Sequence, residues 1–443
     1  MIAGQGAVYG LTETGFTAFA RREDGLRGLE GETSELDGGT LLAGPRSARN
    51  AAALRALVPA LRPQPLGLAP SVGLGDRIGL ATPGHVRALR STASGLAPIF
   101  AQQSIREMER TGRGPGEVMD DATWGLLAAG WQEPFGADAD HLKTTEHIDR
   151  CLPWGYTFFT IDPGDHVGAP VPWERLEDTP RDLVARLARP LDLGDRVLAP
   201  TEEELLGAAA TYGAAVAHVA ELYAHLRDRA PAGSFELEVS VDETDTRTTH
   251  AQHVYIADAL ARLGVRWVSL APRFVGSFEK GIDYLGDVGA LADDLAVHAA
   301  IARRLGPYKL SVHSGSDKFS AYPAIAAATA GVLHLKTAGT SYLEALRAVA
   351  LHDEALMARI YAFALERFAE DRATYHLSAG EPRPETPADL EDPAVRQMLH
   401  VTFGSVLASE LGDELRERLR GDLREPYAEA LERHLGRHLE PFG

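Results

Sequence analysis

"FELEVSVDE", residues 235–243, alternates apolar and polar side chains from Phe235 to Asp242. Successive side chains of a strand point to opposite faces, so in a barrel one set faces the surrounding helices and the other faces the interior. The two sets are Phe235, Leu237, Val239 and Val241, and Glu236, Glu238, Ser240 and Asp242. The stretch therefore predicts a barrel strand that directs carboxylates inward.

Seven further runs of strand length alternate with helical patterns, which is typical of βα units and a parallel sheet. The eight predicted strands are 76–82, 97–104, 137–144, 155–162, 235–243, 266–274, 308–314 and 331–339. Eight such units in a chain of 443 residues favour an α/β fold, a (β/α)8 TIM-type barrel.

The rest of the chain surrounds this predicted barrel, which we place at residues 71–345. Residues 1–70 mix glycine-rich turns with short apolar pieces and predict an N-terminal appendage. A proline-rich stretch and a long alanine-rich helix predict an insertion after the fourth strand, at about 165–232. Residues 346–443 have helical periodicity and predict a C-terminal extension.

Composition narrows the class of protein. With 45% apolar and 24% charged residues the chain is typical of a globular protein, and we expect no membrane span. The 44 basic and 63 acidic residues give a net charge of −19, which opposes binding to nucleic acid.

The N-terminus has no pattern of a secretory signal, so we expect a cytoplasmic protein. The single cysteine, Cys151, excludes a thiolate metal cage and leaves imidazole and carboxylate as metal ligands.

The last four predicted strands all direct polar or ionisable groups to the same inner face. Beyond the first strand quoted, these groups are Ser269 and Arg273, Lys309, Ser311 and His313, and His334 and Lys336. Any one of these side chains, taken alone, is more often a hydrogen-bonded polar residue of the core than a catalytic residue. As a set at the C-terminal strand ends, where barrel enzymes have their active sites, they favour catalysis. "HSGSDKF", residues 313–319, is then the seventh loop of a barrel mouth.

Several stretches together resemble the tagaturonate epimerase family of hexuronate catabolism. They are "ADADHLKT", "FTIDPGDHV", "EVSVDET", "SLAPRFVGSFEKGIDYLGD", "KLSVHSGSDKFSAYP" and "HLKTAGTSYLEALR", and they cover most of residues 135–350. The resemblance implies a metal-dependent interconversion of tagaturonate and fructuronate, which differ at a hydroxyl-bearing carbon β to the ketone. Retro-aldol cleavage with re-addition and proton abstraction after keto migration are both open mechanisms.

Such a reaction needs a divalent cation, and zinc, manganese, nickel, cobalt and iron remain open. We assign the cation to His141, Glu279 and His313, two imidazoles and a carboxylate that leave positions for substrate oxygens. His147 and His334 are the alternative ligands, one beside each assigned histidine in the predicted loops.

For acid–base catalysis we choose Asp140 and Glu243. Strict alternation would point Asp140 and His141 to opposite faces, so the strand must bend or end there if both serve. The reserve carboxylates are Glu146, Glu238 and Asp242; Glu238 could equally form an ion pair with an interior lysine such as Lys309.

Four cations are candidates for binding the substrate's carboxylate and hydroxyls: Lys143, Arg273, Lys318 and Lys336. Arg273 is the first choice for the carboxylate because a guanidinium forms two parallel hydrogen bonds. Lys336 as a Schiff-base lysine would instead make an aldolase. The expected partner is thus a small ketohexuronate, with neither nucleic acid nor membrane, in a possible homo-oligomer. Another metal-dependent sugar isomerase or aldolase on a TIM barrel, and a catalytically silent sugar-acid binding protein, are the alternatives.

Overall fold

A closed barrel of eight parallel strands forms the centre of the computed structural model, which describes residues 1–244, 246–375, 377–380, 382 and 389–443. Its strands are β6 (Ser71–Leu74), β7 (Ala97–Ser104), β8 (Gly136–Leu142), β9 (Phe158–Ile161), β12 (Glu236–Val241), β13 (Ser269–Pro272), β14 (Lys309–Val312) and β15 (Leu333–Thr337). Pairing of β12 with β9 closes the ring. The predicted (β/α)8 fold is confirmed.

Seven of the eight predicted strands overlap an observed strand, whereas the first is wrong. The barrel uses Ser71–Leu74, and 76–82 instead forms the loop that leads into the next helix. Asp76 explains the loop: its carboxylate accepts hydrogen bonds from the backbone N–H groups of Ile78, Gly79 and Ala81. These donors are then unavailable for a strand ladder.

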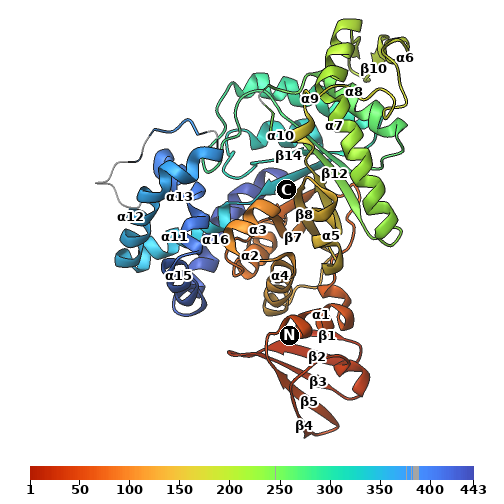
Figure 1. Cartoon of the computed structure of the whole chain (residues 1–443). Coiled ribbons are helices and arrows are strands. Elements are labelled where there is room, and N and C mark those ends of the chain that lie inside the picture. Colours follow the sequence, from red (N-terminus) through yellow and green to blue (C-terminus); the bar gives the residue numbers. More distant parts are fainter. Residues whose placement is uncertain (245, 376, 381, 383–388) are drawn as a thin grey trace.

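Helices follow the strands and cover the outside of the barrel (Figure 1). They are α2 (Thr82–Thr92), α3 (Ile105–Thr111), α4 (Pro115–Ala129), α5 (Thr145–Cys151), α8 (His250–Arg262), α9 (Val288–Leu305), α10 (Tyr322–Thr329) and α11 (Thr340–His352). Short 3-10 turns are η1 (Glu23–Leu26), η2 (Pro59–Leu61), η3 (Leu152–Trp154), η4 (Gly164–His166), η5 (Arg372–Thr374) and η6 (Glu440–Phe442). This arrangement places every βα loop at the same end of the barrel.

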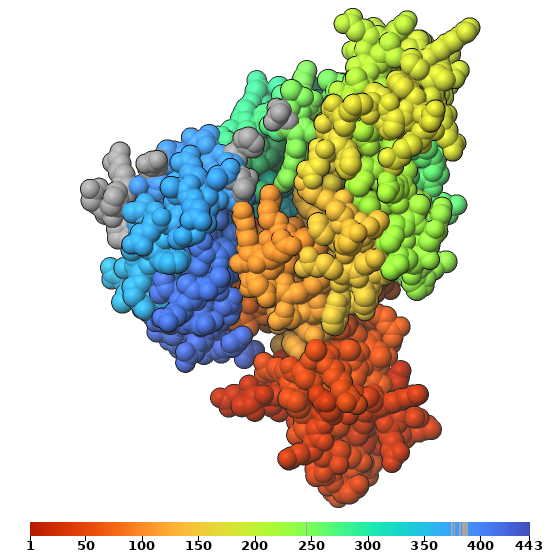
Figure 2. Space-filling view, in the orientation of Figure 1, coloured from red at the N-terminus to blue at the C-terminus, as the bar shows by residue number. Residues whose placement is uncertain are grey.

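The N-terminal residues form a separate five-stranded antiparallel sheet, which projects from one end of the molecule (red in Figure 2). Its strands are β1 (Ile2–Gly4), β2 (Ala7–Leu11), β3 (Phe16–Ala20), β4 (Glu32–Leu36) and β5 (Gly39–Gly44), and α1 (Ala48–Leu57) follows them. Phe16 packs on Trp124 of α4, and this contact joins the sheet to the barrel helices.

The segment between β9 and β12 holds α6 (Pro180–Leu187), the ribbon β10 (Leu191–Asp192) and β11 (Val197–Leu198), and α7 (Glu202–Arg229). By length and composition α7 is long and apolar enough to cross a membrane, a test that core helices also pass. More than half of its apolar window is buried, however, and α7 packs beside α8. Its apolar face thus belongs to the protein core.

After α11 the described chain is helical, as predicted: α12 (Glu354–Asp371), α13 (Pro393–Val401), α14 (Phe403–Leu407), α15 (Glu410–Arg420) and α16 (Arg424–Leu439). These helices share a second hydrophobic core with Ile78 and Ala81 of the first barrel loop. The last helix, α16, packs against α2 and α11. The C-terminal helices therefore flank the barrel, as Figure 1 shows in blue.

Arg77 joins the first barrel loop to these helices through buried contacts. Its guanidinium lies 2.6 Å from Glu107, donates to the carbonyl of His400, and stacks 3.8 Å from the Phe403 ring. Both charged side chains of the ion pair are almost fully buried. Removing one partner of such a pair leaves an uncompensated buried charge.

We therefore expect Arg77→Ala to lower the free energy of unfolding by about 3–5 kcal/mol. The matched control is Arg87→Ala, which breaks the exposed pair with Glu425 and should cost less than about 1 kcal/mol. Chemical denaturation of both variants measures the difference. Equal losses would show that the buried contacts of Arg77 with Glu107, His400 and Phe403 contribute no more to stability than an exposed ion pair.

Candidate active site

Titratable side chains gather at the C-terminal ends of the barrel strands, around a narrow cavity. Its wall includes Gln102 from β7, Asp140 and His141 from β8, His313 after β14 and Lys336 from β15. Residues outside the strands also line it, among them Lys280 from the loop after β13 and His400 from α13. The cavity is thus built jointly by the barrel and the C-terminal extension.

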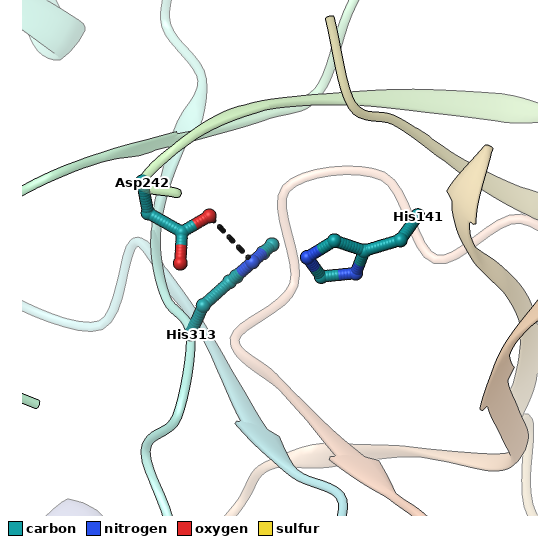
Figure 3. Close-up of side chains that lie close together, drawn as sticks. All are labelled: His141, Asp242 and His313. Atoms are coloured by element: carbon teal, nitrogen blue, oxygen red, sulfur yellow. Dashed lines mark ion pairs between the residues drawn. The ribbon is translucent and has the colours of Figure 1, made fainter. Parts of the chain in front are cut away.

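Two groups of potential metal ligands share His141 in this region: it lies with Asp242 and His313, and also with Asp162 and Glu243. Within each group, one ligand atom of each residue lies within 4.8 Å of the other two. The two imidazole rings point toward each other with centroids 5.2 Å apart, and Asp242 lies 3.1 Å from Nδ1 of His313 (Figure 3). Two imidazoles and a carboxylate form a suitable ligand set for a divalent transition metal.

A local distortion of β8 allows both Asp140 and His141 to face the site. The register between β8 and β9 shifts between Ala139 and Leu142, and His141 has a φ of 54°. A positive φ is uncommon for residues other than glycine and redirects the side chain. Asp140 Oδ1 then lies 2.8 Å from Nδ1 of His141. The bend that the sequence required at this point is therefore present.

The carboxylates determine the charge of the two histidines. Burial lowers the pKa of His141, but Asp140 and Glu243 outweigh it and raise the value to about 10. For His313, burial acts in the same direction and is outweighed chiefly by Asp242, so its pKa rises to about 9. Both imidazoles therefore carry protons in the absence of another cation. Metal binding displaces such protons, so this acidic surrounding fits a divalent ion.

Lys336 lies at the centre of the barrel interior and is enclosed by carboxylates. Its Nζ is 2.9 Å from Asp138, 2.6 Å from Asp140 and 2.9 Å from Glu238. Although burial opposes it, these carboxylates raise the pKa of Lys336 well above its ordinary value. A protonated, fully hydrogen-bonded amine is a poor nucleophile, so this environment does not favour a Schiff-base lysine.

Glu238 occupies the same interior layer and is paired, but not with Lys309. It lies 2.7 Å from Nε2 of His313 and accepts a hydrogen bond from Ser269. Lys309 instead donates to Ser71. Glu238 therefore contacts one ring nitrogen of His313 and fixes the orientation of the imidazole. Carboxylates commonly have this role beside metal-binding histidines.

The structure does not bring Glu279 to the metal ligands that we assigned with it. Its carboxylate accepts hydrogen bonds from the backbone and hydroxyl of Ser378 and from Gln397. These bonds tie the loop after β13 to the C-terminal extension. Asp242, which we had kept as a reserve acid or base, takes its place beside His141 and His313.

Two of the predicted substrate-binding cations are also placed differently. Lys318 is fully buried, and its Nζ donates to the backbone carbonyls of Glu279, Ile282 and Ser316. All three N–H groups are then used, and burial lowers the pKa of this lysine to about 7. Arg273 lies after β13 and is not among the residues that line the cavity. Lys318 thus has no N–H group left for a substrate, and Arg273 stays a prediction.

The remaining candidates lie at the rim or below the site. Lys143 pairs with Asp165 at 2.8 Å and lies 3.6 Å from Asp162. Glu243 stands at the mouth, with Oε1 3.9 Å from Nε2 of His141. His147 and Glu146 belong to α5, whereas His334 is buried beside Ser71, where burial lowers its pKa to about 3.

Sequence reasoning missed four contributors: Asp138, Gln102, Lys280 and His400. Asp138 belongs to the stretch "ADADHLKT", and period-two alternation with Asp140 could have found it. Gln102 donates to Asp140 from a neighbouring strand. Lys280 and His400 come from a loop and a distant helix, for which local periodicity contains no signal.

Comparisons with known proteins agree with this geometry. The sequence profile of the tagaturonate epimerase family matches residues 21–442. The chain belongs to the tagaturonate epimerase family. A family member from Thermotoga maritima, the tagaturonate/fructuronate epimerase, is 47% identical over 380 residues, which cover 82% of this chain and 78% of that protein.

Crystal structures of the fructuronate-tagaturonate epimerase from Cohnella laeviribosi share the fold of this family member. The native form and a form with one bound glycerol each superpose with a TM-score of 0.89 at 34% identity, covering 100% of this chain and 95% of the other. The resemblance that the sequence motifs suggested is confirmed.

The two alternative carboxylates can be compared directly by mutation. We expect Asp242→Asn to weaken metal binding at the barrel mouth by about tenfold or more, because it removes an anionic ligand. Glu279→Gln should leave metal affinity within about twofold, since its carboxylate contacts Ser378 and Gln397 instead. Isothermal titration with a divalent cation measures both. The opposite ranking would return Glu279 to the metal site.

Proposed function

We propose that this protein is a metal-dependent epimerase that interconverts D-tagaturonate and D-fructuronate. The observation that carries the proposal is the convergence of His141, Asp242 and His313 at the mouth of the barrel of a tagaturonate epimerase family member. The names of the Thermotoga maritima and Cohnella laeviribosi relatives support the same substrates.

The donor set suits zinc, nickel, cobalt, iron or manganese. When bound, the cation would polarise the ketone and stabilise the negative charge that develops on its oxygen. The protein's own contribution is to orient the ligands: Asp140 holds His141 through Nδ1, and Glu238 holds His313 through Nε2. Each ring then presents its other nitrogen to the site.

Inversion at a carbon β to the ketone can proceed by cleavage and re-formation of one carbon–carbon bond. A base removes the proton of the hydroxyl on that carbon, and the bond to the α carbon breaks. This gives an aldehyde and an enediolate, with no atom gained or lost. Rotation of the aldehyde and re-addition to its other face produce the epimer, and the proton returns to the hydroxyl oxygen.

Glu243 is the residue that we assign as this base. It is at the mouth, partly exposed, and near His141, so it can reach a substrate hydroxyl. Asp140 was our other choice, but its oxygens accept hydrogen bonds from Gln102 and Lys336 as well as contacting His141. We therefore assign Asp140 a positioning role. Asp162 is the counterpart that we assign to Glu243; its buried Oδ2 accepts no hydrogen bond among the described residues and lies 3.6 Å from Nζ of Lys143.

Lys280 is the cation that we assign to the substrate carboxylate, in place of Arg273 and Lys318. It lines the cavity, and across the described parts of the chain its ammonium forms no hydrogen bond or ion pair. A lysine beside a cavity offers three donors and a positive charge. Lys336 contributes indirectly, since its ammonium is already held by three carboxylates.

We expect Lys280→Met to raise KM for tagaturonate about 10- to 100-fold with a smaller change in kcat, because a hydrogen bond to a charged group contributes about 1.5–3 kcal/mol. Steady-state kinetics measures both constants. The control is Arg273→Lys, which should leave KM within about threefold if that side chain is outside the site. A raised KM in the control alone would assign the carboxylate to Arg273.

The activity itself is tested by adding tagaturonate to protein treated with a chelator, with and without divalent cations, in deuterated water. We expect fructuronate only after cation is restored, and no deuterium in its carbon skeleton, because bond cleavage exchanges only hydroxyl protons. NMR of the product measures both. Deuterium at carbon would contradict the cleavage route, and absence of product with every cation would contradict the assigned substrate.

A further inference from the structure

A second group of imidazoles and a carboxylate lies outside the barrel wall, between α8 and α9. His250 is the first residue of α8, and Asp294 and His298 lie one turn apart on α9. Nε2 of His250 is 3.1 Å from Asp294 Oδ1, and Nε2 of His298 is 3.8 Å from the same oxygen. One ligand atom of each residue lies within 4.8 Å of the other two.

The buried ring of His298 points to a ligand that the chain does not supply. Its side chain is fully buried, and within the described ranges Nε2 has no hydrogen-bond partner. The other nitrogen is occupied, because Nδ1 lies 2.8 Å from Nδ1 of His253. A buried ring nitrogen without a partner is costly, and a cation at Nε2 would remove that cost.

Second contacts are compatible with the tautomer of this ring that binds metal through Nε2. His253 Nε2 lies 2.8 Å from the hydroxyl of Tyr308, which can accept its proton. In that arrangement His298 donates from Nδ1 to Nδ1 of His253, and a lone pair remains on its Nε2.

Asp294 is oriented in the same way. Its Oδ2 accepts a hydrogen bond from the backbone N–H of Val275, so Oδ1 remains for the two histidines. No lysine or arginine pairs with Asp294 among the residues that the structure describes. The third group of this kind, Asp317, His434 and His438, differs because Arg396 lies 3.0 Å from Asp317 and already neutralises it.

We propose that His250, Asp294 and His298 form a second divalent-cation site, suited to Zn²⁺. Two imidazoles and one carboxylate are zinc donors, and water can occupy the fourth position on the side of His250, whose side chain is 31% exposed. The ion would cross-link α8 to α9. Through Val275 it would also hold the loop after β13, which carries Lys280.

The test is zinc stoichiometry of the full chain, by equilibrium dialysis and elemental analysis. We expect His250→Gln and Asp294→Asn each to lower the zinc affinity of this site by about tenfold or more. At a zinc concentration that fills the site only in the wild-type protein, wild type should therefore bind one equivalent of zinc more than either variant. The matched control is His225→Gln. His225 forms a similar pair with Asp149, at 2.8 Å, but belongs to none of the described metal-ligand groups, so the variant should bind as much zinc as wild type.

A second background separates this site from the barrel mouth. In Asp242→Asn protein, zinc should still raise Tm, and adding His250→Gln should abolish that rise. The proposed site would be contradicted if His250→Gln bound as much zinc as the wild-type protein and showed the same zinc-induced rise in Tm. That result would leave the epimerase assignment intact, because epimerisation is measured separately. Since His250 is partly exposed, its variant decides the question even where Asp294→Asn fails to fold.

Discussion

The ammonium of Lys336 is the interaction on which the interior of this barrel depends. Three carboxylates, from Asp138, Asp140 and Glu238, meet it within 2.9 Å in a region closed to solvent. Buried carboxylates without a cation would be strongly destabilising. One ammonium cannot neutralise three of them, and burial accordingly raises the pKa of Asp138 to about 7 against the pull of Lys336. The carboxylate charge that Lys336 does not neutralise lies next to His141 and His313, and it favours the binding of a cation there.

The C-terminal helices are part of this site as well as a cover for it. His400 lines the cavity, Gln397 holds Glu279, and Arg77 fastens His400 to the first barrel loop. Lys318 joins the same sixth loop to the seventh loop through three backbone carbonyls. The loops that shape the mouth are thus held by buried polar contacts as well as by packing. Such contacts are directional, and they keep the ligand atoms in register.

Alternation along β12 to β15 was sufficient to predict a barrel with a charged interior, because a period of two reports which face a side chain occupies. The same reasoning failed at 76–82, where Asp76 turns an apolar run into a capped loop. It also chose Glu279 over Asp242, since position along a loop does not tell where a flexible segment folds back. Lys280 and His400 required tertiary structure, because their neighbours in space are distant in sequence.

Chain synthesis adds a constraint of timing to the interior cluster. Asp138, Asp140 and Glu238 leave the ribosome well before Lys336, which belongs to the last barrel strand. Until that strand arrives, an early half-barrel would have to enclose the carboxylates either uncompensated or protonated. The last strand pairs with the first, so the contact that closes the ring is also the one that brings the ammonium of Lys336 to the three carboxylates.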